Sequence, residues 1–226
     1  MDAWPKWILS TALTLVALLV ALCFGVYWYG ASALPAVLEP SAYVAPASIR
    51  EQFRLVEAGN ATRLPKLNPV TVWYHLHRSM GSDATSRSEL TALGQASRVV
   101  SIRDTPRLAN LRRHAADLAR MIRISRNWSF QQVLDTRLAE SWFGRDSKGL
   151  EAAAHAYFGF APTQLTPEES LALIVLMRGP SAYDPTCHRE RFVERYVRVA
   201  PLAGIDPVPE AAERALVRLR DPQCRR

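Results

Sequence analysis

The chain opens with an apolar segment from Trp7 to Tyr29 in which no residue is charged. A helix rises about 1.5 Å per residue, so a segment of 23 residues is long enough to cross a bilayer core of roughly 30 Å. Lys6 precedes the segment and the next basic residue is Arg50. Positively charged residues stay on the cytoplasmic side, so this distribution predicts a cytoplasmic N-terminus and a domain outside the inner membrane. Aromatic residues of the membrane-interface type flank the segment: Trp4, Trp7, Tyr27, Trp28 and Tyr29.

A cleaved signal peptide is the alternative for this segment, with Ala31-Ser32-Ala33 as a possible cleavage site. The apolar run is longer than the roughly 7–15 residues usual in signal peptides, which favours an uncleaved single-pass anchor. We therefore expect a cytoplasmic stub and transmembrane anchor over residues 1–29. A linker rich in Pro, Ala and Ser follows over residues 30–48.

Beyond residue 48 the apolar residues recur mostly at helical spacing. Residues 49–58 predict an amphipathic helix, and residues 167–177 predict a buried helix that Gly179-Pro180 ends. Thr105-Pro106 is expected to start a third helix, whose apolar stripe is Leu108, Leu111, Ala115, Leu118 and Ile122. Capping boxes are expected at Ser129 with Gln132 and at Thr166 with Glu169.

Two short basic helices are expected over residues 188–200 and 209–220, and the basic tail from Arg218 to Arg226 is expected to be solvated. Strand signals are sparse, and His75 and His77 alternate on one side of a possible strand. The sequence therefore predicts a mainly α domain.

Composition adds charge and length limits to this picture. The 226 residues suffice for one compact domain plus an anchor, and the net charge is +7, carried by 25 Arg and 3 Lys. Arginine can bind phosphate with two hydrogen bonds, but charge alone identifies no partner, and a solvated basic face is the favoured explanation. Export across the membrane argues against nucleic acid as the partner. No His/Cys cluster has metal-binding spacing, and Cys187 and Cys224 are free to pair in an oxidising compartment.

Five segments share one register with a known family: Trp142-Phe143-Gly144, residues 150–154, Tyr157-Phe158-Gly159, residues 165–169 and residues 180–185. They resemble the family 51 glycosyltransferases, which polymerise lipid II into peptidoglycan glycan strands, alone or within penicillin-binding proteins. The resemblance implies a lysozyme-like helical domain over residues 49–200 with a single membrane anchor. Residues 201–226 then form a C-terminal helical extension.

The resemblance also implies a reaction. A carboxylate takes the proton from an acceptor hydroxyl, whose oxygen displaces lipid pyrophosphate from the donor sugar with inversion. A second acidic residue, basic side chains and often a divalent cation such as Mg²⁺ support the departing pyrophosphate. Two carboxylates and a cationic surface are therefore the features to look for.

Glu57 is the best match to the family's catalytic glutamate, although Ala58 replaces the Asp that follows it in the family. A rival register, anchored on Gly81-Ser82-Asp83, would put Val72 at the glutamate position and Ser79 at the family's His. Glu57 is otherwise expected to be a surface carboxylate paired with Arg50 or Arg54.

The remaining family motifs keep their apolar positions and lose most polar ones. Residues 95–102 align with the donor-binding motif and retain Ser97, and residues 113–117 align with the motif that ends in the second catalytic acid, here Asp117. Asp117 is otherwise an ion-pair partner of Arg113 and Arg120. Arg112, Arg113 and Arg120 belong to a cationic helix that could contact pyrophosphate or anionic lipid headgroups. In residues 130–139 the family's Lys, Tyr and Asn are replaced by Phe130, Arg137 and Ala139.

Three functions follow from this pattern of retained packing and lost chemistry. The first is a catalytically degenerate domain that binds lipid II, a nascent glycan strand or another cell-wall synthase. The second is an active, divergent glycosyltransferase with Glu57 as base and Asp117 as second acid, with Mg²⁺ as its only expected cofactor. The third is a structural interaction module that does not bind glycan.

Overall fold

The computed structural model describes residues 6–81, 83–104, 108–220 and 224, and these fold as two compact units. Unit 1 comprises the described parts of residues 1–38 and 65–127, and unit 2 comprises the described parts of residues 39–64 and 128–226. Their regular elements are helices except for one two-stranded hairpin, which confirms the mainly α prediction.

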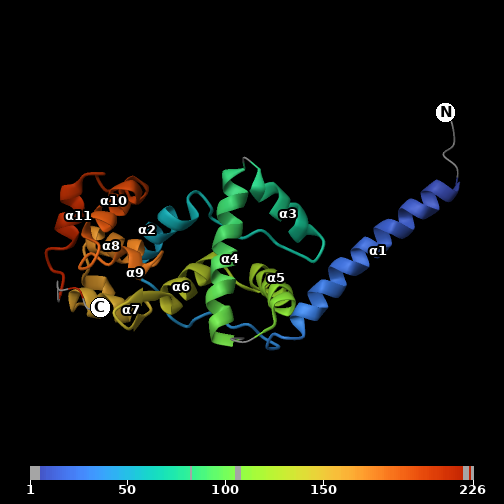
Figure 1. Ribbon diagram of the computed structural model, residues 1–226, viewed down its shortest axis with the longest axis horizontal. Coiled ribbons are helices and arrows are strands. Elements are labelled where there is room, and N and C mark those ends of the chain that lie inside the picture. Colours follow the sequence, from blue (N-terminus) through green and yellow to red (C-terminus); the bar gives the residue numbers. More distant parts are fainter. Residues whose placement is uncertain (1–5, 82, 105–107, 221–223, 225–226) are drawn as a thin grey trace. The chain divides into compact units, whose positions relative to one another are not determined.

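Unit 1 contains four helices, labelled in Figure 1: α1 (Lys6–Ala31), α3 (Thr71–Met80), α4 (Ala84–Asp104) and α5 (Asn110–Asn127). α3 packs on α4, and α4 packs on α5. His75 and His77 lie in α3, so the expected strand is wrong. The predicted helix start at Thr105-Pro106 falls outside the described residues.

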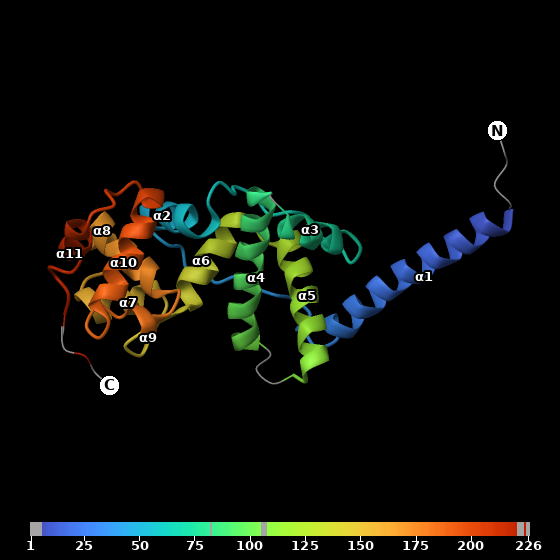
Figure 2. The same ribbon diagram turned by 45° about the horizontal axis from the view of Figure 1, so that its top comes forward.

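α1 is the one described helix that is long and apolar enough to cross a membrane, over Trp7–Ala31. Its C-terminal end packs against α5 and the rest projects away from it (Figure 2). Gly30 makes the closest approach, because a Cβ atom there would lie 2.0 Å from the carbonyl oxygen of Ala115. Only glycine permits this backbone contact. The next residue, Ala31, is buried in unit 1.

α5 shows the predicted helical periodicity with one difference. Ala115 and Ile122 are buried as expected, whereas Leu111 is 76% exposed. The buried side of the helix instead includes Ala116 and Ala119. These small side chains allow close packing of α5 against neighbouring backbones.

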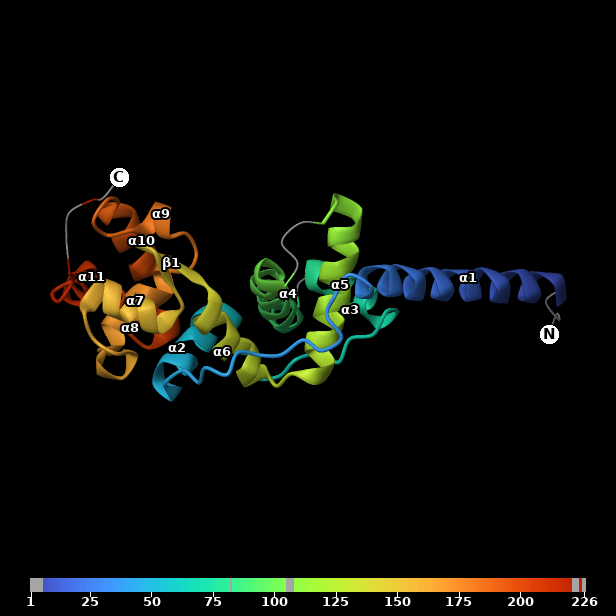
Figure 3. The ribbon, with the colours of Figure 1, turned by 90° about the horizontal axis from the view of Figure 1, so that it is seen from below.

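Unit 2 surrounds an apolar core with helices and one hairpin (Figure 3). Its elements are α2 (Ala47–Ala58), α6 (Phe130–Glu140), β1 (Trp142–Gly144), β2 (Ser147–Lys148), α7 (Leu150–Phe158), η1 (Pro162–Gln164), α8 (Pro167–Leu176), α9 (Pro180–Tyr183), α10 (Arg189–Val199), η2 (Ala200–Ala203) and α11 (Pro209–Ala215). α8 contacts α2, α10 and α11, and its residues 169–176 are all buried. The predicted capping boxes at Ser129 and Thr166 are confirmed.

The hairpin β1–β2 leads into α7, and glycines set its geometry. Gly159 ends α7 in the left-handed conformation. Gly144 lies in β1 with φ of 85°. Gly149 precedes α7 with φ of 87°, and a Cβ atom there would lie 2.5 Å from the carbonyl oxygen of Ala139.

Replacing Gly149 by Ala is therefore expected to destabilise the protein by about 2 kcal/mol or more, since it combines a left-handed φ with a backbone clash. Gly94→Ala in α4 is the matched control, because nothing lies within 4 Å of the added methyl group. The control is expected to stabilise the helix by up to about 1 kcal/mol. Thermal unfolding of both variants measures the two effects, and equal shifts would contradict the prediction.

The C-terminal segment packs onto unit 2, which corrects the expectation of a solvated tail. Arg218 forms an ion pair with the buried Glu169 and stacks over the ring of Phe160. The backbone amide of Arg220 donates to the carbonyl oxygen of Tyr157 at 2.7 Å. Cys187 and Cys224 form a disulfide. The domain boundaries expected after residues 48 and 200 stay predictions.

Candidate functional site

Glu57 lies in the last turn of α2, and its side chain is only 2% exposed. Both carboxylate oxygens accept hydrogen bonds from arginines. Oε2 lies 3.1 Å from Nη2 of Arg137, and Oε1 lies 2.8 Å from Nε of Arg178. All three residues belong to unit 2, so the contact lies within one compact body.

Three elements position this cluster. α2 buries Phe53 one turn before Glu57, and the guanidinium of Arg137 lies 4.6 Å from the centre of the Phe53 ring. α6 holds Arg137 between the buried Leu134 and Leu138. Arg178 follows the end of α8, just before α9 begins at Pro180. The apolar faces of α2, α6 and α8 therefore bring Glu57 and its partners together.

The electrostatics of the cluster keep Glu57 ionised. Burial alone would raise the pKa of its carboxyl group, but the charge of Arg137 and the hydrogen bond from Arg178 outweigh burial and hold the pKa below its usual value of 4.5. Burial lowers the pKa of the Arg137 guanidinium, and the Glu57 charge opposes that effect. Glu57 is thus a carboxylate with both oxygens engaged, which weakens it as a proton acceptor.

The surface role expected for Glu57 is wrong, and the two arginines assigned to it have other partners. Arg50 pairs with Asp135 at 3.1 Å, and Arg54 pairs with Glu51 at 2.6 Å. In the rival register, Val72 is fully buried in α3 and carries no chemistry there.

Asp117, Ser97 and Arg120 come together where α5 packs on α4 in unit 1. Asp117 Oδ1 accepts a 2.6 Å hydrogen bond from Arg120, and the Asp117 side chain is 38% exposed. Arg120 is fully buried and also donates to the carbonyl oxygen of Ser97 at 3.4 Å. Ser97 Oγ donates to the backbone carbonyl oxygen of Asp117 at 3.3 Å. The ion pair expected as the alternative role of Asp117 is therefore present with Arg120.

The cationic face predicted on this helix is smaller than expected, because Arg120 points inward. Arg113 is exposed and donates to Asn110 at 3.3 Å rather than pairing with Asp117. Arg112 lies 5.9 Å from the centre of the Tyr29 ring, at the end of α1. Arg112 and Arg113 therefore remain in the predicted cationic face, and Arg112 is the one that lies beside α1.

The described residues do not fit the divalent cation that the resemblance implies. Mg²⁺ takes several oxygen ligands, usually including carboxylates. Arginines occupy both oxygens of Glu57 and one oxygen of Asp117. Among the residues that the structure describes, no group of three or more His, Cys, Asp or Glu side chains could hold a metal ion. Glu57 and Asp117 also belong to different units.

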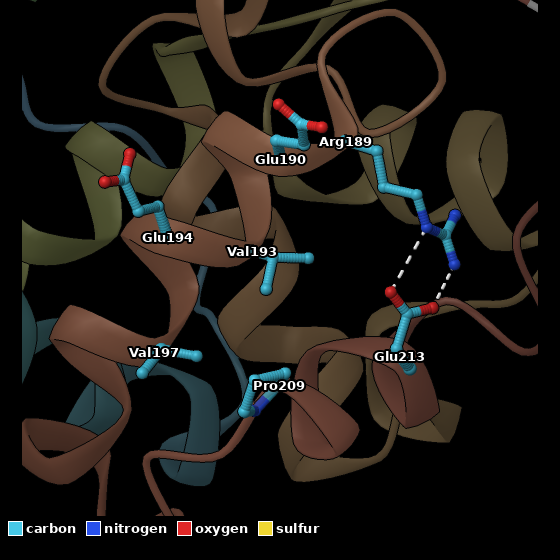
Figure 4. A pocket seen from close by; sticks show the side chains of 7 residues that line it. All are labelled: Arg189, Glu190, Val193, Glu194, Val197, Pro209 and Glu213. Atoms are coloured by element: carbon cyan, nitrogen blue, oxygen red, sulfur yellow. Dashed lines mark hydrogen bonds and ion pairs between the residues drawn. The ribbon is translucent and has the colours of Figure 1, made fainter.

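A groove of about 660 Å³ lies between α10 and α11 in unit 2 (Figure 4). Its apolar part consists of Val193, Val197 and Pro209. An ion pair between Arg189 and Glu213 crosses it, and two further carboxylates, Glu190 and Glu194, lie on α10. None of the predicted site residues lines this groove.

The described residues form a mainly helical protein with an apolar N-terminal helix and two carboxylates, each held by arginine. Sequence comparison identifies the family that has these features. The Transglycosylase family matches residues 88–203, and the chain belongs to this family. The family match confirms the resemblance and the lysozyme-like fold. It includes Asp117 and both arginines that contact Glu57, whereas Glu57 itself precedes it.

Similar proteins are penicillin-binding proteins. The chain is 38% identical over 82 residues to penicillin-binding protein 1A of Mycobacterium tuberculosis, covering 36% of this chain and 10% of that protein. It is 34% identical over 74 residues to penicillin-binding protein 2D of Bacillus subtilis, covering 33% of this chain and 11% of that protein. The match thus spans about a tenth of the length of these relatives.

The two arginines that hold Glu57 were not among the site residues predicted from the sequence. Arg137 gave a signal, because a charged residue stands between the apolar Leu134 and Leu138 at a position where the family has Tyr. Arg178 gave none, because it falls in a stretch where the family motif specifies no residue type.

Proposed function

We propose that this chain is a membrane-anchored transglycosylase-family domain of peptidoglycan synthesis that binds lipid II or a nascent glycan strand and has lost most of its polymerising activity. The observation that carries this proposal is the capture of Glu57 by Arg137 and Arg178. General base catalysis typically contributes a factor of about 10²–10⁴ to rate and works best with a pKa near the operating pH. Glu57 has a pKa below 4.5 and no free oxygen.

The proposed location is the inner membrane, with a cytoplasmic N-terminus and the domain outside. α1 has the length and composition of a membrane span. Gly30 and Ala31 are buried in unit 1, and cleavage after Ala33 would remove both. The packing of these residues supports an uncleaved anchor over a signal peptide.

An active, divergent glycosyltransferase is the alternative, and the exposure of Arg178 favours it. The Arg178 side chain is 40% exposed, so a movement of this one residue would free Oε1 of Glu57. Asp117 is partly exposed and keeps Oδ2 for a second role. An interaction module that binds another cell-wall synthase is supported by the groove between α10 and α11.

The deciding experiment is lipid II polymerisation by the full-length protein in detergent, with glycan chains resolved on a gel. We expect no chains from the wild type, together with saturable binding of fluorescent lipid II. Glu57→Gln is expected to leave that binding intact, and Glu51→Gln on the exposed side of α2 is the matched control. Wild-type chains that disappear with Glu57→Gln alone would establish an enzyme, and absent lipid II binding would favour the interaction module.

A further inference from the structure

The groove between α10 and α11 is apolar at its centre and acidic around it. Val193, Val197 and Pro209 supply the apolar side chains, and most of the open surface is apolar. Three glutamates and one arginine lie around them, so the lining carries two negative charges in a chain whose net charge is +7. The volume of about 660 Å³ lies within the range of roughly 300–1,000 Å³ that is typical of ligand pockets. The groove is thus large enough to accept several side chains of a partner.

Two of the three glutamates are available to a partner. Glu213 pairs with Arg189, which leaves Glu190 and Glu194 without a hydrogen-bond or ion-pair partner among the residues that the structure describes. Both are exposed and stand one helical turn apart on α10. Like charges at this spacing repel each other, so a cationic partner would relieve a repulsion that the free helix contains.

The sign of this charge selects the class of partner. Two unpaired carboxylates repel phosphate groups, anionic lipids and acidic peptides, whereas they attract arginine and lysine side chains. The groove therefore does not suit the anionic ligands that the family resemblance implies for other parts of the chain. Its apolar centre also calls for apolar side chains beside the cations, because removing apolar surface from water is the main driving force of protein association.

The geometry of the groove favours a helix as the bound segment. Its walls are two helices, whose backbone groups are bonded within each helix, so the groove offers no strand edge to an extended peptide. Val193 and Val197 form a row with a spacing of one turn, which matches the rows of side chains that a facing helix presents. Because α10 has 11 residues, it is about 16 Å long, and a partner helix of about three turns covers it.

We propose that the groove between α10 and α11 is a docking site for a helical segment of another protein, in which a row of apolar side chains is flanked by arginine or lysine residues one turn apart. The apolar row packs on Val193, Val197 and Pro209, and the cations pair with Glu190 and Glu194. The site does not depend on the proposed binding of lipid II, because the residues that line it are not those assigned to that function. Such a short contact predicts weak, transient binding.

The test uses the full-length protein in nanodiscs of neutral phosphatidylcholine and a fluorescent synthetic helix of about four turns, with a leucine row flanked by arginines. We expect fluorescence anisotropy to show saturable binding above that of empty nanodiscs. The double variant Glu190→Gln with Glu194→Gln should weaken this binding about fivefold, because each exposed ion pair contributes little by itself. Val197→Arg places a cation in the apolar centre and should abolish the binding. The matched control, Glu51→Gln with Glu151→Gln, changes the net charge equally at exposed positions outside the groove and should bind as tightly as the wild type.

Three results would overturn the proposal: no saturable binding, equal affinity of the wild type and the groove double variant, or tighter binding of a matched helix with glutamate in place of arginine. Sedimentation of the protein in detergent tests a further occupant, because self-association that Val197→Arg abolishes would assign the groove to a second copy of this chain instead. Circular dichroism and the thermal midpoint identify a variant that fails to fold. If Val197→Arg fails to fold, the groove double variant at its two exposed positions still decides the test. Lipid II binding is measured separately, so failure of either proposal is recognisable by itself.

Discussion

Replacing Arg137 by Met is expected to lower the free energy of unfolding by about 3 kcal/mol, because removing one member of a buried ion pair leaves a buried charge without its main partner. Glu57 and Arg137 are 2% and 6% exposed. Met fills similar space over Phe53 but cannot neutralise the carboxylate. Urea unfolding followed by circular dichroism measures the loss.

The double variant Glu57→Gln with Arg137→Met is the internal control. Removing both charges relieves the penalty of the unpaired carboxylate, so we expect the double variant to be more stable than Arg137→Met alone. Arg189→Met removes one member of an exposed pair with Glu213 and should have little effect. A double variant as unstable as the sum of the two single variants would show that the charges do not interact.

The contact between Glu57 and Arg137 also predicts how stability depends on pH. The folded-state pKa of Glu57 lies below its ordinary value of 4.5. The stability that this difference contributes is fully present above about pH 4.5 and is lost as the pH falls through the lowered pKa. In Arg137→Met only Arg178 opposes the effect of burial on Glu57, so the pKa of the Glu57 carboxyl group rises. The acid-unfolding midpoint of that variant should therefore move to higher pH, and an unchanged midpoint would argue against the pairing.

Reduction of the Cys187–Cys224 disulfide is expected to lower the free energy of unfolding by about 4 kcal/mol on the loop-entropy model. The bond joins residues that are 37 positions apart and ties the C-terminal segment to the turn before α10. Urea unfolding with and without reductant measures the effect, and the double variant Cys187→Ala with Cys224→Ala should match the reduced wild type.

Cys23→Ala is the control for the disulfide, because Cys23 is a free cysteine in α1. This variant should keep the full response to reductant. Thiol titration of the unfolded wild type without reductant should find one reactive cysteine. Three reactive thiols, or identical unfolding midpoints with and without reductant, would contradict the assignment.

Local features of the sequence predicted most of the helices. The capping box at Thr166 and the apolar run that follows it place α8 within a residue or two of its observed bounds. The amphipathic pattern of residues 49–58 likewise predicts α2. Such signals depend on neighbours three or four positions away, which a linear sequence displays directly.

The partners of Glu57 could not be predicted in the same way. Arg137 and Arg178 are 80 and 121 positions away from it in the chain. The contacts exist only after α2, α6 and α8 pack together. Ion pairs between distant residues leave no periodic pattern in the sequence from which they could be predicted. Arg120 shows the opposite difficulty. It stands in a helix rich in arginine, yet Asp117 and the carbonyl oxygen of Ser97 allow its complete burial.

The contact between Gly30 and the backbone of Ala115 makes α1 a rigid extension of unit 1 rather than a loose tether. A long apolar helix adjusts its tilt to the thickness of the bilayer around it. If α1 spans the membrane, each change in that tilt rotates α5 with it, together with Arg112 beside Tyr29. The inclination of unit 1 over the lipid surface is then set by the bilayer itself, so membranes of different thickness would present its surface at different angles. A larger side chain at residue 30 would uncouple the two motions.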